Sequence, residues 1–337
     1  MANPLVSVVV TTFNHEQYIE DALASVFRQS FTDFEVIVVD DGSTDDTPER
    51  LAAFGDQITL IRQPNAGVAG SRNTGVSHAR GQFVAFLDGD DIWHEEKLGV
   101  QVAAALAHPE AGLIAVDGVQ FEGDSILSNS LFRDIGPIGE WRDGIVTGNC
   151  YARLLHSQII CTISQVMVQA AVLRAIGPSD SGFLRASDYD LYIRISRSHS
   201  FALVRRSLVS WRYLPTSASG PNDLRSIKYL PEDIAILKKN SRDADKNSRK
   251  LIRKSVGQKR RKMARRLYDY GRDGHRRFAT STLVGFLRSN PDSLWTILYL
   301  VGLWSPRFLT RYVGGGLRAI RDAFNGTFDP SGARKRS

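Results

Sequence analysis

The chain has 337 residues, which is enough for one large domain with an appendage or for two domains. A hydrophobic content of 42% and a charged content of 23% are ordinary for a folded protein, so disorder is not the default. Cys150 and Cys161 are too few for a disulfide framework and favour a reducing compartment. The longest apolar run, 294–304, is about half of the ~20 residues that a membrane-spanning helix needs. The N-terminus also lacks the basic region of a signal peptide, so we expect a cytoplasmic protein.

Charge is distributed unevenly along the chain, although the net charge is only +7. Residues 1–237 carry 18 Lys and Arg against 29 Asp and Glu, whereas residues 238–337 carry 25 against 7. This asymmetry indicates two parts with different partners. We expect an acidic domain at 1–235, a basic helical region at 236–329 and a disordered tail at 330–337.

The first hundred residues alternate between strand-like and helix-like periodicity. Strands are predicted for runs rich in β-branched and apolar residues, at 5–12, 34–39, 58–61 and 83–87. Helices are predicted between them, at 16–29, 47–54 and 68–78. Thr47 is expected to be an N-cap, with Pro48 at the first helical position. The alternation predicts an α/β fold whose mostly parallel sheet has helices on both faces.

Polar and acidic residues follow these strands at the points where the strands end. Asn14, Asp40-Asp41 and the cluster of Asp88, Asp90 and Asp91 all fall at carboxyl ends, where parallel sheets bind ligands. Acids crowded in this way repel one another. A hard divalent cation that bridges to phosphate oxygens would relieve the repulsion. The alternative, a solvated acidic turn, explains an isolated D-x-D pair but not this convergence. Whether Asp88 or Asp91 would bind such a cation together with Asp90 is left open.

Further along the chain, a helix is predicted near 95–107 and a strand near 113–116. Residues 117–149 are rich in glycine and polar residues, which predicts an irregular insertion that faces the substrate. A strand running into a helix is predicted over 166–176, ended by Gly177-Pro178. Another helix is predicted to begin at 187–190.

Four stretches in order resemble the motifs of family 2 glycosyltransferases, which are inverting, nucleotide-sugar-dependent enzymes with the GT-A fold. They are SVVVTTFN at 7–14, VVDDGSTD at 38–45, GSRNTG at 70–75 and LDGDD at 87–91. The resemblance covers about residues 5–213. It implies a GT-A, Rossmann-like catalytic domain, followed here by a basic, mainly α-helical C-terminal extension.

The resemblance also implies a nucleotide site built from these motifs. Asp41 would accept a hydrogen bond from the imide N–H of uracil, with Thr11 packed beside it. The alternative role for Asp41 is a helix N-cap. Arg72 would contact the nucleotide, because its planar fork suits phosphate or a base carbonyl. Asp88 would contact ribose or metal, and Asp90 would coordinate Mn²⁺ or Mg²⁺ on the diphosphate.

An inverting transfer also needs a general base. Family members commonly carry it as the Asp of a Glu-Asp pair that opens a helix, followed by Asp-Leu and Arg. Residues 186–194 read ASDYDLYIR, which puts Asp188 in the base position with Ser187 in place of the usual Glu. Asp190 is the alternative base. Both acids could instead be first-turn residues that the helix dipole favours.

Several other side chains have two interpretations each. The segment 211–213, Trp-Arg-Tyr, resembles the one that closes the catalytic domain in many relatives, where Arg212 either approaches the diphosphate or packs at the surface. Trp93 either stacks on a sugar ring or packs against a helix. Four histidines without metal spacing are expected to be structural, namely His15, His78, His94 and His108.

The C-terminal third is dominated by positive charge. Residues 238–277 contain 17 Lys and Arg against 4 Asp and Glu, and predict a basic helix with a thin apolar stripe. With the apolar patches at 283–287 and 294–304, this composition suits an element that lies on an anionic membrane surface. Packing on the catalytic domain is an alternative. Nucleic-acid binding is the least supported alternative, because no nucleic-acid-binding motif accompanies the charge.

The sequence therefore predicts an inverting glycosyltransferase that moves a sugar from a UDP-sugar to a hydroxyl of a glycan, such as a lipid-linked surface polysaccharide precursor. We expect Mn²⁺ or Mg²⁺ as cofactor, and a cytoplasmic location at the inner face of the membrane. A sugar nucleotidyltransferase would need a Gly-rich loop after the first strand, and residues 11–16 contain no glycine. A non-catalytic basic binding module would not need an acid at every expected position.

Overall fold

The structure, a computed structural model of the chain, describes residues 3–133, 135, 138–214, 224–242, 244–270 and 276–289. The chain divides into two compact units, residues 1–256 and 257–337. The apolar patch at 294–304 and the tail at 330–337 lie outside the described residues. The predicted boundary after residue 235 stays a prediction.

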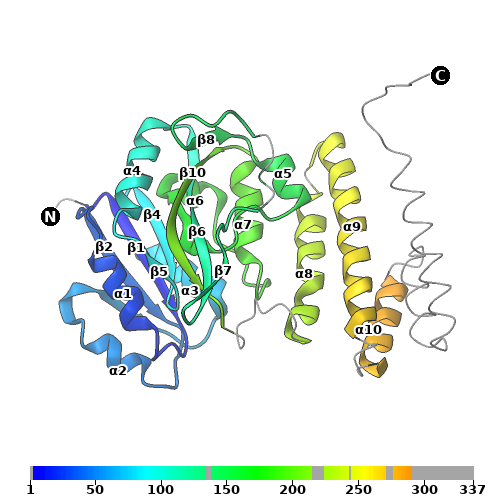
Figure 1. Cartoon of the computed structure of the whole chain (residues 1–337), viewed down its shortest axis with the longest axis horizontal. Helices are drawn as coiled ribbons and strands as arrows, with labels where there is room; N and C mark the ends of the chain where they lie inside the picture. The colour runs from blue at the N-terminus through cyan, green and yellow to red at the C-terminus, as the bar shows by residue number, and fades with distance from the viewer. Residues whose placement is uncertain are drawn as a thin grey trace. The chain divides into compact units, whose positions relative to one another are not determined.

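The first half of the sheet is parallel, in the strand order β3-β2-β1-β4 (Figure 1). Its strands are β1 (Val6–Thr12), β2 (Phe34–Asp40), β3 (Thr59–Arg62) and β4 (Phe83–Asp88). The connecting helices are α1 (Ile19–Phe27), α2 (Thr47–Ala52) and α3 (Gly67–His78). Every residue of β1 is buried, as expected for a Val-rich strand covered on both faces. The α/β alternation predicted for this part is confirmed.

The second half makes the sheet mixed rather than mostly parallel. Strand β9 (Val166–Gln169) lies antiparallel between β4 and β6 (Ala111–Glu122). Strand β10 (Ser200–Arg212) pairs in parallel with β6, and β5 (Ile92–Trp93) pairs with β10 at the edge. The remaining helices of this half are α4 (Lys97–Ala107), α5 (Tyr151–His156), α6 (Ala170–Ile176) and α7 (Ser187–Ser196). The predicted strand-to-helix segment at 166–176 and the helix beginning at 187 are confirmed.

The prediction of an irregular insertion over 117–149 is wrong in part. Strand β6 continues to Glu122, and two further strands, β7 (Ser125–Ser128) and β8 (Ile145–Gly148), pair with β6 and β10. A Cβ on Gly118 would collide with the carbonyl oxygen of Val209 on β10. The glycine here therefore permits close backbone approach inside the sheet rather than marking a loop.

Small residues let α3 pack closely on the sheet. A Cβ on Gly75 would collide with the side chain of Val9 in β1, and it would also meet Val39 in β2. Gly75 therefore allows close contact between this helix and the strands. It fixes the position of α3, the helix that carries Arg72.

Helix α2 begins differently from the prediction. Its N-cap is Asp46, and Thr47 and Pro48 occupy the first two helical positions. Thr47 is instead used across the chain, because its hydroxyl accepts a hydrogen bond from the backbone N–H of His15 at 2.9 Å. The N-cap predicted at Thr47 is therefore wrong, and the Thr47 hydroxyl instead bonds to a residue 32 positions away in the sequence.

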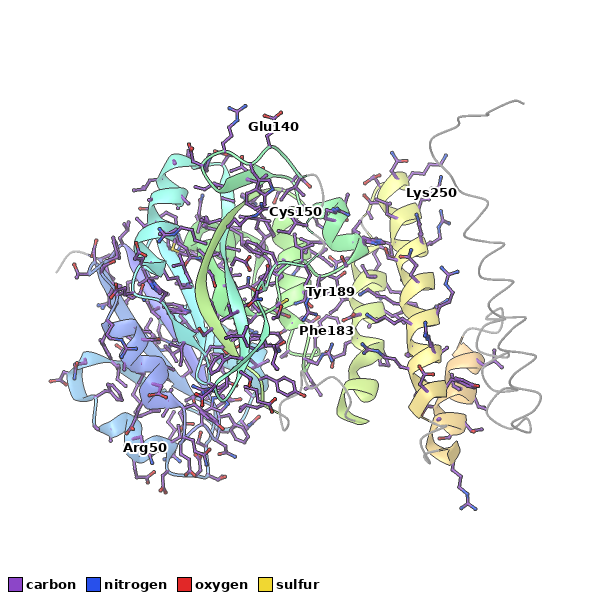
Figure 2. All side chains as sticks on the ribbon, viewed as in Figure 1. Arg50, Glu140, Cys150, Phe183, Tyr189 and Lys250 are labelled. Atoms are coloured by element: carbon purple, nitrogen blue, oxygen red, sulfur yellow. The ribbon has the colours of Figure 1, made fainter. Side chains whose placement is uncertain are left out.

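Helix α8 (Leu224–Asn240) packs on α7 and spans the predicted boundary after residue 235. Asp190 of α7 accepts hydrogen bonds from Arg194, Lys239 and Asn240 at 2.9–3.1 Å. The Lys239 ammonium also lies 5.2 Å from the ring centre of Phe183, in the loop before α7 (Figure 2). These contacts join α8 to α7 and to the loop before it.

Glu232 of α8 fixes the loop that leads into α7. Its carboxylate accepts hydrogen bonds from three successive backbone N–H groups, those of Leu184, Arg185 and Ala186, at 3.0–3.2 Å. Ala186 is the N-cap of α7 and has no capping side chain of its own. Glu232 therefore supplies from α8 the negative charge that a helix N-terminus favours.

The basic C-terminal helices are α9 (Lys246–Tyr270) and α10 (Arg276–Ser289). The predicted apolar stripe of α9 is present, since Ile252, Val256, Met263 and Leu267 are buried, whereas Leu251 is 40% exposed. None of the helices in the described part of the chain is long and apolar enough to cross a membrane.

We expect Glu232→Ala to lower the free energy of unfolding by about 1–3 kcal/mol, because three backbone donors lose a charged acceptor. Urea unfolding followed by circular dichroism measures the change. Glu122→Ala, an exposed acid at the end of β6, is the control. Equal stability of the two variants would contradict the role assigned to Glu232.

Candidate active site

The predicted strand ends meet at one edge of the parallel half of the sheet. Thr11 pairs with Asp88 between β1 and β4, and Thr12 pairs with Asp40 between β1 and β2. The Thr11 hydroxyl donates a hydrogen bond to Asp88 Oδ1 at 3.3 Å, whereas the sequence placed Thr11 beside Asp41. The acids at these strand ends are therefore neighbours, at the position where open α/β sheets bind ligands.

Asp41 follows β2 and is 4% exposed. Its Oδ1 accepts hydrogen bonds from the Gln63 side chain at 2.8 Å and from the backbone N–H of Ala66 at 2.9 Å. Because Asp46 is the N-cap of the following helix, the helix-cap alternative for Asp41 is wrong. Asp41 is thus held in one orientation by the loop after β3.

Arg72 of α3 forms an ion pair with Asp88, with 2.8 Å between Arg72 Nη2 and Asp88 Oδ1. Arg72 is 7% exposed, and its Nε is buried without a hydrogen-bond partner in the described structure. Burial opposes the charge of the guanidinium, but Asp88 and Asp188 outweigh it and raise the pKa of Arg72. The pair keeps a strong cation at the strand ends with donor capacity left over.

Asp91 is buried, and both of its carboxylate oxygens are hydrogen-bonded. One carboxylate oxygen accepts hydrogen bonds from Ser164 at 2.6 Å and Thr162 at 3.2 Å, and the other accepts the backbone N–H of Arg212 at 3.0 Å. Burial, followed by repulsion from Asp90 and Asp88, raises the pKa of Asp91 well above its usual value. Asp91 therefore anchors the acidic loop to two distant segments.

Asp90 has the opposite environment from Asp91. Its backbone carbonyl accepts a hydrogen bond from Arg212 Nε at 2.9 Å, but its carboxylate receives no side-chain hydrogen bond from the described residues. Burial and repulsion from Asp88 raise the pKa of Asp90, although His15 and Arg212 lower it. Asp90 is therefore a half-buried acid whose carboxylate has no side-chain donor among the described residues.

The donor set at this loop fits a hard divalent cation. Across the described residues, no group of three or more His, Cys, Asp or Glu side chains is arranged to hold a metal ion by itself. Mg²⁺ and similar ions, however, commonly take one or two carboxylates and complete their shell with phosphate oxygens and water. Asp90, with Asp88 close enough to raise its pKa, matches that pattern.

Asp188, in the first turn of α7, faces a cavity of about 180 Å³. Its carboxylate accepts hydrogen bonds from the Gln158 side chain at 3.1 Å and from the backbone N–H of Tyr189 at 2.7 Å. Burial raises the pKa of Asp188 to about 6, although Arg72 lowers it. The cavity is lined by Arg72, Asp88, Arg133, Gln158, Cys161, Thr162, Ile163, Arg185, Ala186, Asp188 and Trp211. Two nucleotide-site candidates and the candidate base thus share one cavity.

Asp190, the alternative base, lies outside this cavity. It is fully buried, and its carboxylate is held by Arg194, Lys239 and Asn240. A carboxylate with two cationic partners and no exposure cannot reach a substrate hydroxyl. The geometry therefore favours Asp188 as the acid available for chemistry.

A separate hollow of about 370 Å³ adjoins Asp90 and includes Asn14, His15 and Tyr18 in its lining. His15 Nδ1 is buried there without a hydrogen-bond partner among the described residues. Because His15 lowers the pKa of Asp90, it lies at the candidate site, a position that the sequence did not predict.

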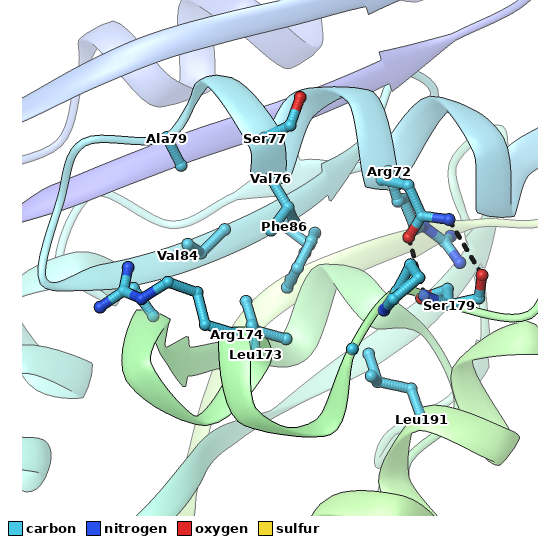
Figure 3. Close-up of a pocket in the computed structure, with 14 residues that line it drawn as sticks. Arg72, Val76, Ser77, Ala79, Val84, Phe86, Leu173, Arg174, Ser179 and Leu191 are labelled. Carbon is cyan, nitrogen blue, oxygen red and sulfur yellow. Dashed lines mark hydrogen bonds between the residues drawn. The ribbon is translucent and has the colours of Figure 1, made fainter.

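A third cavity, of about 370 Å³, lies between α3, β4 and α6 (Figure 3). Its lining is mainly apolar and contains no carboxylate. Asn73 and Ser179 exchange two hydrogen bonds at its border, of 2.8 and 2.9 Å. Arg72 lines both this cavity and the Asp188 cavity, but the candidate carboxylates Asp88 and Asp188 line only the latter.

Sequence reasoning missed Arg133, Gln158 and Arg185, which all line the Asp188 cavity. Nothing in their local sequence marks them, because contacts between distant segments bring them to the site.

Trp93 is 3% exposed, and its indole N–H donates to the carbonyl of Ser164 at 3.0 Å. Its sugar-stacking interpretation is therefore wrong.

Comparisons with known proteins agree with this fold. Residues 7–153 match the sequence model of Glycosyl transferase family 2. The chain is 28% identical over 232 residues to UDP-Glc:alpha-D-GlcNAc-diphosphoundecaprenol beta-1,3-glucosyltransferase WfgD of Escherichia coli, covering 68% of this chain and 84% of WfgD. It is 26% identical over 211 residues to the uncharacterized glycosyltransferase RP339 of Rickettsia prowazekii (strain Madrid E), covering 62% of this chain and 64% of that protein.

The fold is also similar to a solved structure, S. aureus TarS 1–349 in complex with UDP. The TM-score is 0.57 at 18% sequence identity, and the match covers 88% of this chain and 89% of that one. This neighbour has the predicted GT-A fold. The match to the family model, together with the motif order and the similarity to these relatives, identifies a family 2 glycosyltransferase domain in this chain.

Proposed function

We propose that this glycosyltransferase moves a sugar from a UDP-sugar to a hydroxyl of a lipid-linked glycan, with inversion, in the synthesis of a cell-surface polysaccharide. The observation that carries the proposal is the shared cavity of Arg72, Asp88 and Asp188. The name of WfgD, which uses UDP-Glc and a diphosphoundecaprenol-linked acceptor, supports the donor and acceptor classes. The TarS structures with UDP and with UDP-GlcNAc support the same donor class.

Asp188 is proposed as the general base. It would take the proton of the acceptor hydroxyl while that oxygen attacks the anomeric carbon of the donor sugar. The bond from that carbon to the diphosphate breaks on the opposite face, so the configuration inverts. A pKa of about 6 leaves Asp188 mostly ionised at neutral pH, yet makes it a stronger base than an ordinary carboxylate. The hydrogen bonds from Gln158 and Tyr189 hold it in place.

The strand-end residues are proposed to bind the nucleotide. Asp41, fixed by Gln63 and Ala66, would accept the imide N–H of uracil. Arg72 would use its unpartnered Nε, and Thr11 and Asp88 would complete the nucleotide contacts. A Mn²⁺ or Mg²⁺ ion at Asp90 would neutralise the charge that develops on the departing UDP.

The basic C-terminal region is proposed to hold the enzyme at the inner face of the membrane, next to a lipid-linked acceptor. Residues 238–277 supply the positive charge, and anionic lipid attracts it with about 1 kcal/mol per residue. The similarity to family 2 glycosyltransferases favours a transferase over the nucleotidyltransferase and non-catalytic alternatives.

Asp188→Asn is expected to lower the transfer rate by a factor of about 10²–10⁴, because the amide cannot accept the proton. UDP affinity should stay unchanged. Radiolabelled sugar transfer from UDP-glucose and UDP-GlcNAc to lipid-linked acceptors measures the rate, and calorimetry measures UDP affinity. Full transfer activity in the variant would rule out Asp188 as the base.

The same role predicts a pH profile for the wild-type enzyme. Only ionised Asp188 can accept a proton, so kcat/KM should rise with pH up to about 6 and level off above it. A profile that stays flat between pH 5 and 7 would contradict a base with this pKa.

Asp90→Asn is expected to abolish binding of Mn²⁺ in the presence of UDP, because the amide removes the ligand charge. Electron paramagnetic resonance of Mn²⁺ measures the bound fraction. Asp91→Asn is the control and should keep bound Mn²⁺, since Asp91 is held by Ser164 and Thr162. Loss of Mn²⁺ only in the Asp91 variant would reverse the assignment.

A further inference from the structure

Three arginines from separate segments line the Asp188 cavity. They are Arg72 of α3, Arg133 after β7 and Arg185 in the loop before α7. Arg72 is paired with Asp88 at 2.8 Å. The side chains of Arg133 and Arg185 make no ion pair or hydrogen bond with any described residue. Two uncompensated guanidinium groups therefore share the cavity with Asp188.

The backbones that carry these two arginines are fixed. The N–H of Arg185 donates to Glu232 at 3.0 Å, and the N–H of Arg133 donates to the carbonyl of Ile159 at 3.0 Å. Burial raises the pKa of Asp188 and of Cys161, and the charges of Arg185 and Arg133 oppose that rise at Asp188 and at Cys161, respectively. Arg133 is exposed and Arg185 is half-buried, but both charges act on groups that line the cavity.

The two arginines and the candidate metal ligand Asp90 line different hollows. Asp90 lines the hollow that contains Asn14 and His15, whereas Arg133 and Arg185 line the cavity of the candidate base. In an inverting transfer, the base and the acceptor lie on the face of the donor sugar opposite the diphosphate. The cavity also contains the nucleotide-site candidates Arg72 and Asp88. An acceptor whose hydroxyl reaches Asp188 must enter this cavity, so it enters the space that the two arginines line.

We propose that Arg133 and Arg185 bind a phosphate group of the acceptor, next to the hydroxyl that Asp188 deprotonates. A guanidinium fork matches phosphate oxygens with paired, charge-assisted hydrogen bonds. The inference rests on the proposed function, and it names the acceptor class as a sugar whose phosphate or diphosphate link lies close to the reacting hydroxyl. Arg133 and Arg185 are then the residues that select this class over neutral glycans.

The test compares three probes in the full-length protein saturated with UDP and Mn²⁺. They are α-D-GlcNAc 1-phosphate, methyl α-D-GlcNAc and methyl β-D-glucuronide, which carry a phosphate, no charge and a carboxylate. Calorimetry should show that the phosphate probe binds wild-type protein about tenfold or more tightly than the other two. Arg133→Ala and Arg185→Ala should each remove about tenfold of that affinity and leave UDP affinity unchanged.

Arg142→Ala is the matched control, because Arg142 is exposed, pairs with Glu140 and does not line the cavity. If the alanine variants do not fold, Arg133→Lys and Arg185→Lys replace them in the test. Lysine keeps the charge without the guanidinium fork, so these variants should bind the phosphate probe with intermediate affinity. Equal affinity of wild-type protein for the phosphate and neutral probes would overturn the proposal. Tighter binding of the glucuronide, or loss of UDP affinity in the arginine variants, would overturn it as well.

The proposed function can fail separately. If wild-type protein does not bind UDP, the UDP-dependent function is wrong, and the same probes are titrated into the free protein. Selective binding of the phosphate probe that depends on Arg133 and Arg185 would then still support an anion site. Its absence would overturn the site itself.

Discussion

The structure depends on how one short loop accommodates three carboxylates at the end of a buried strand. Like charges this close oppose one another's ionisation, so each acid needs a hydrogen-bond donor or a cation as a partner. Asp88 is paired with Arg72, and Asp91 is held by Ser164, Thr162 and a backbone N–H. Asp90 alone is left without a side-chain donor among the described residues. The protein thus provides partners for two of the three acids and leaves the Asp90 carboxylate open to a ligand.

Of the two acids in the first turn of helix α7, one is likewise paired inside the protein and the other faces a cavity. Asp190 is buried and neutralised by Arg194 and Lys239, so it fastens α7 to α8. Asp188, two residues earlier, faces the cavity with a raised pKa. Glu232 of α8 also holds the loop before α7, so α8 supports the helix that carries the candidate base. Helix α8 runs across residue 235, where the sequence analysis placed its boundary.

Local patterns predicted the elements that come from contiguous residues. Val-rich strands buried on both faces, alternating with short helices, have an unmistakable period, and the acids at their ends could be placed without coordinates. The ion pair between Arg72 and Asp88 was not foreseen as such, but both residues were singled out by their motifs. In each case the relevant contact lies between neighbouring strands or between a strand and its own crossover helix.

Prediction failed where distant segments decide the structure. The strands within 117–149 exist because they pair with β6 and β10, and no local period reveals such a partner. Thr47 lost its capping role to a contact with His15. The loop of Arg133 is bonded to Ile159 and that of Arg185 to Glu232, contacts between segments far apart in the sequence, so the positions of both arginines could not be predicted from the sequence.

The central claim is that the strand-end acids form a metal-assisted UDP site. Calorimetric titration with UDP, GDP, CDP and dTDP, each with and without Mn²⁺, tests it most directly. The account predicts selective binding of UDP that becomes tighter with Mn²⁺, through Asp41 for uracil and Asp90 for the metal. Equal affinity for all four nucleotides, or no binding by folded protein, would contradict it.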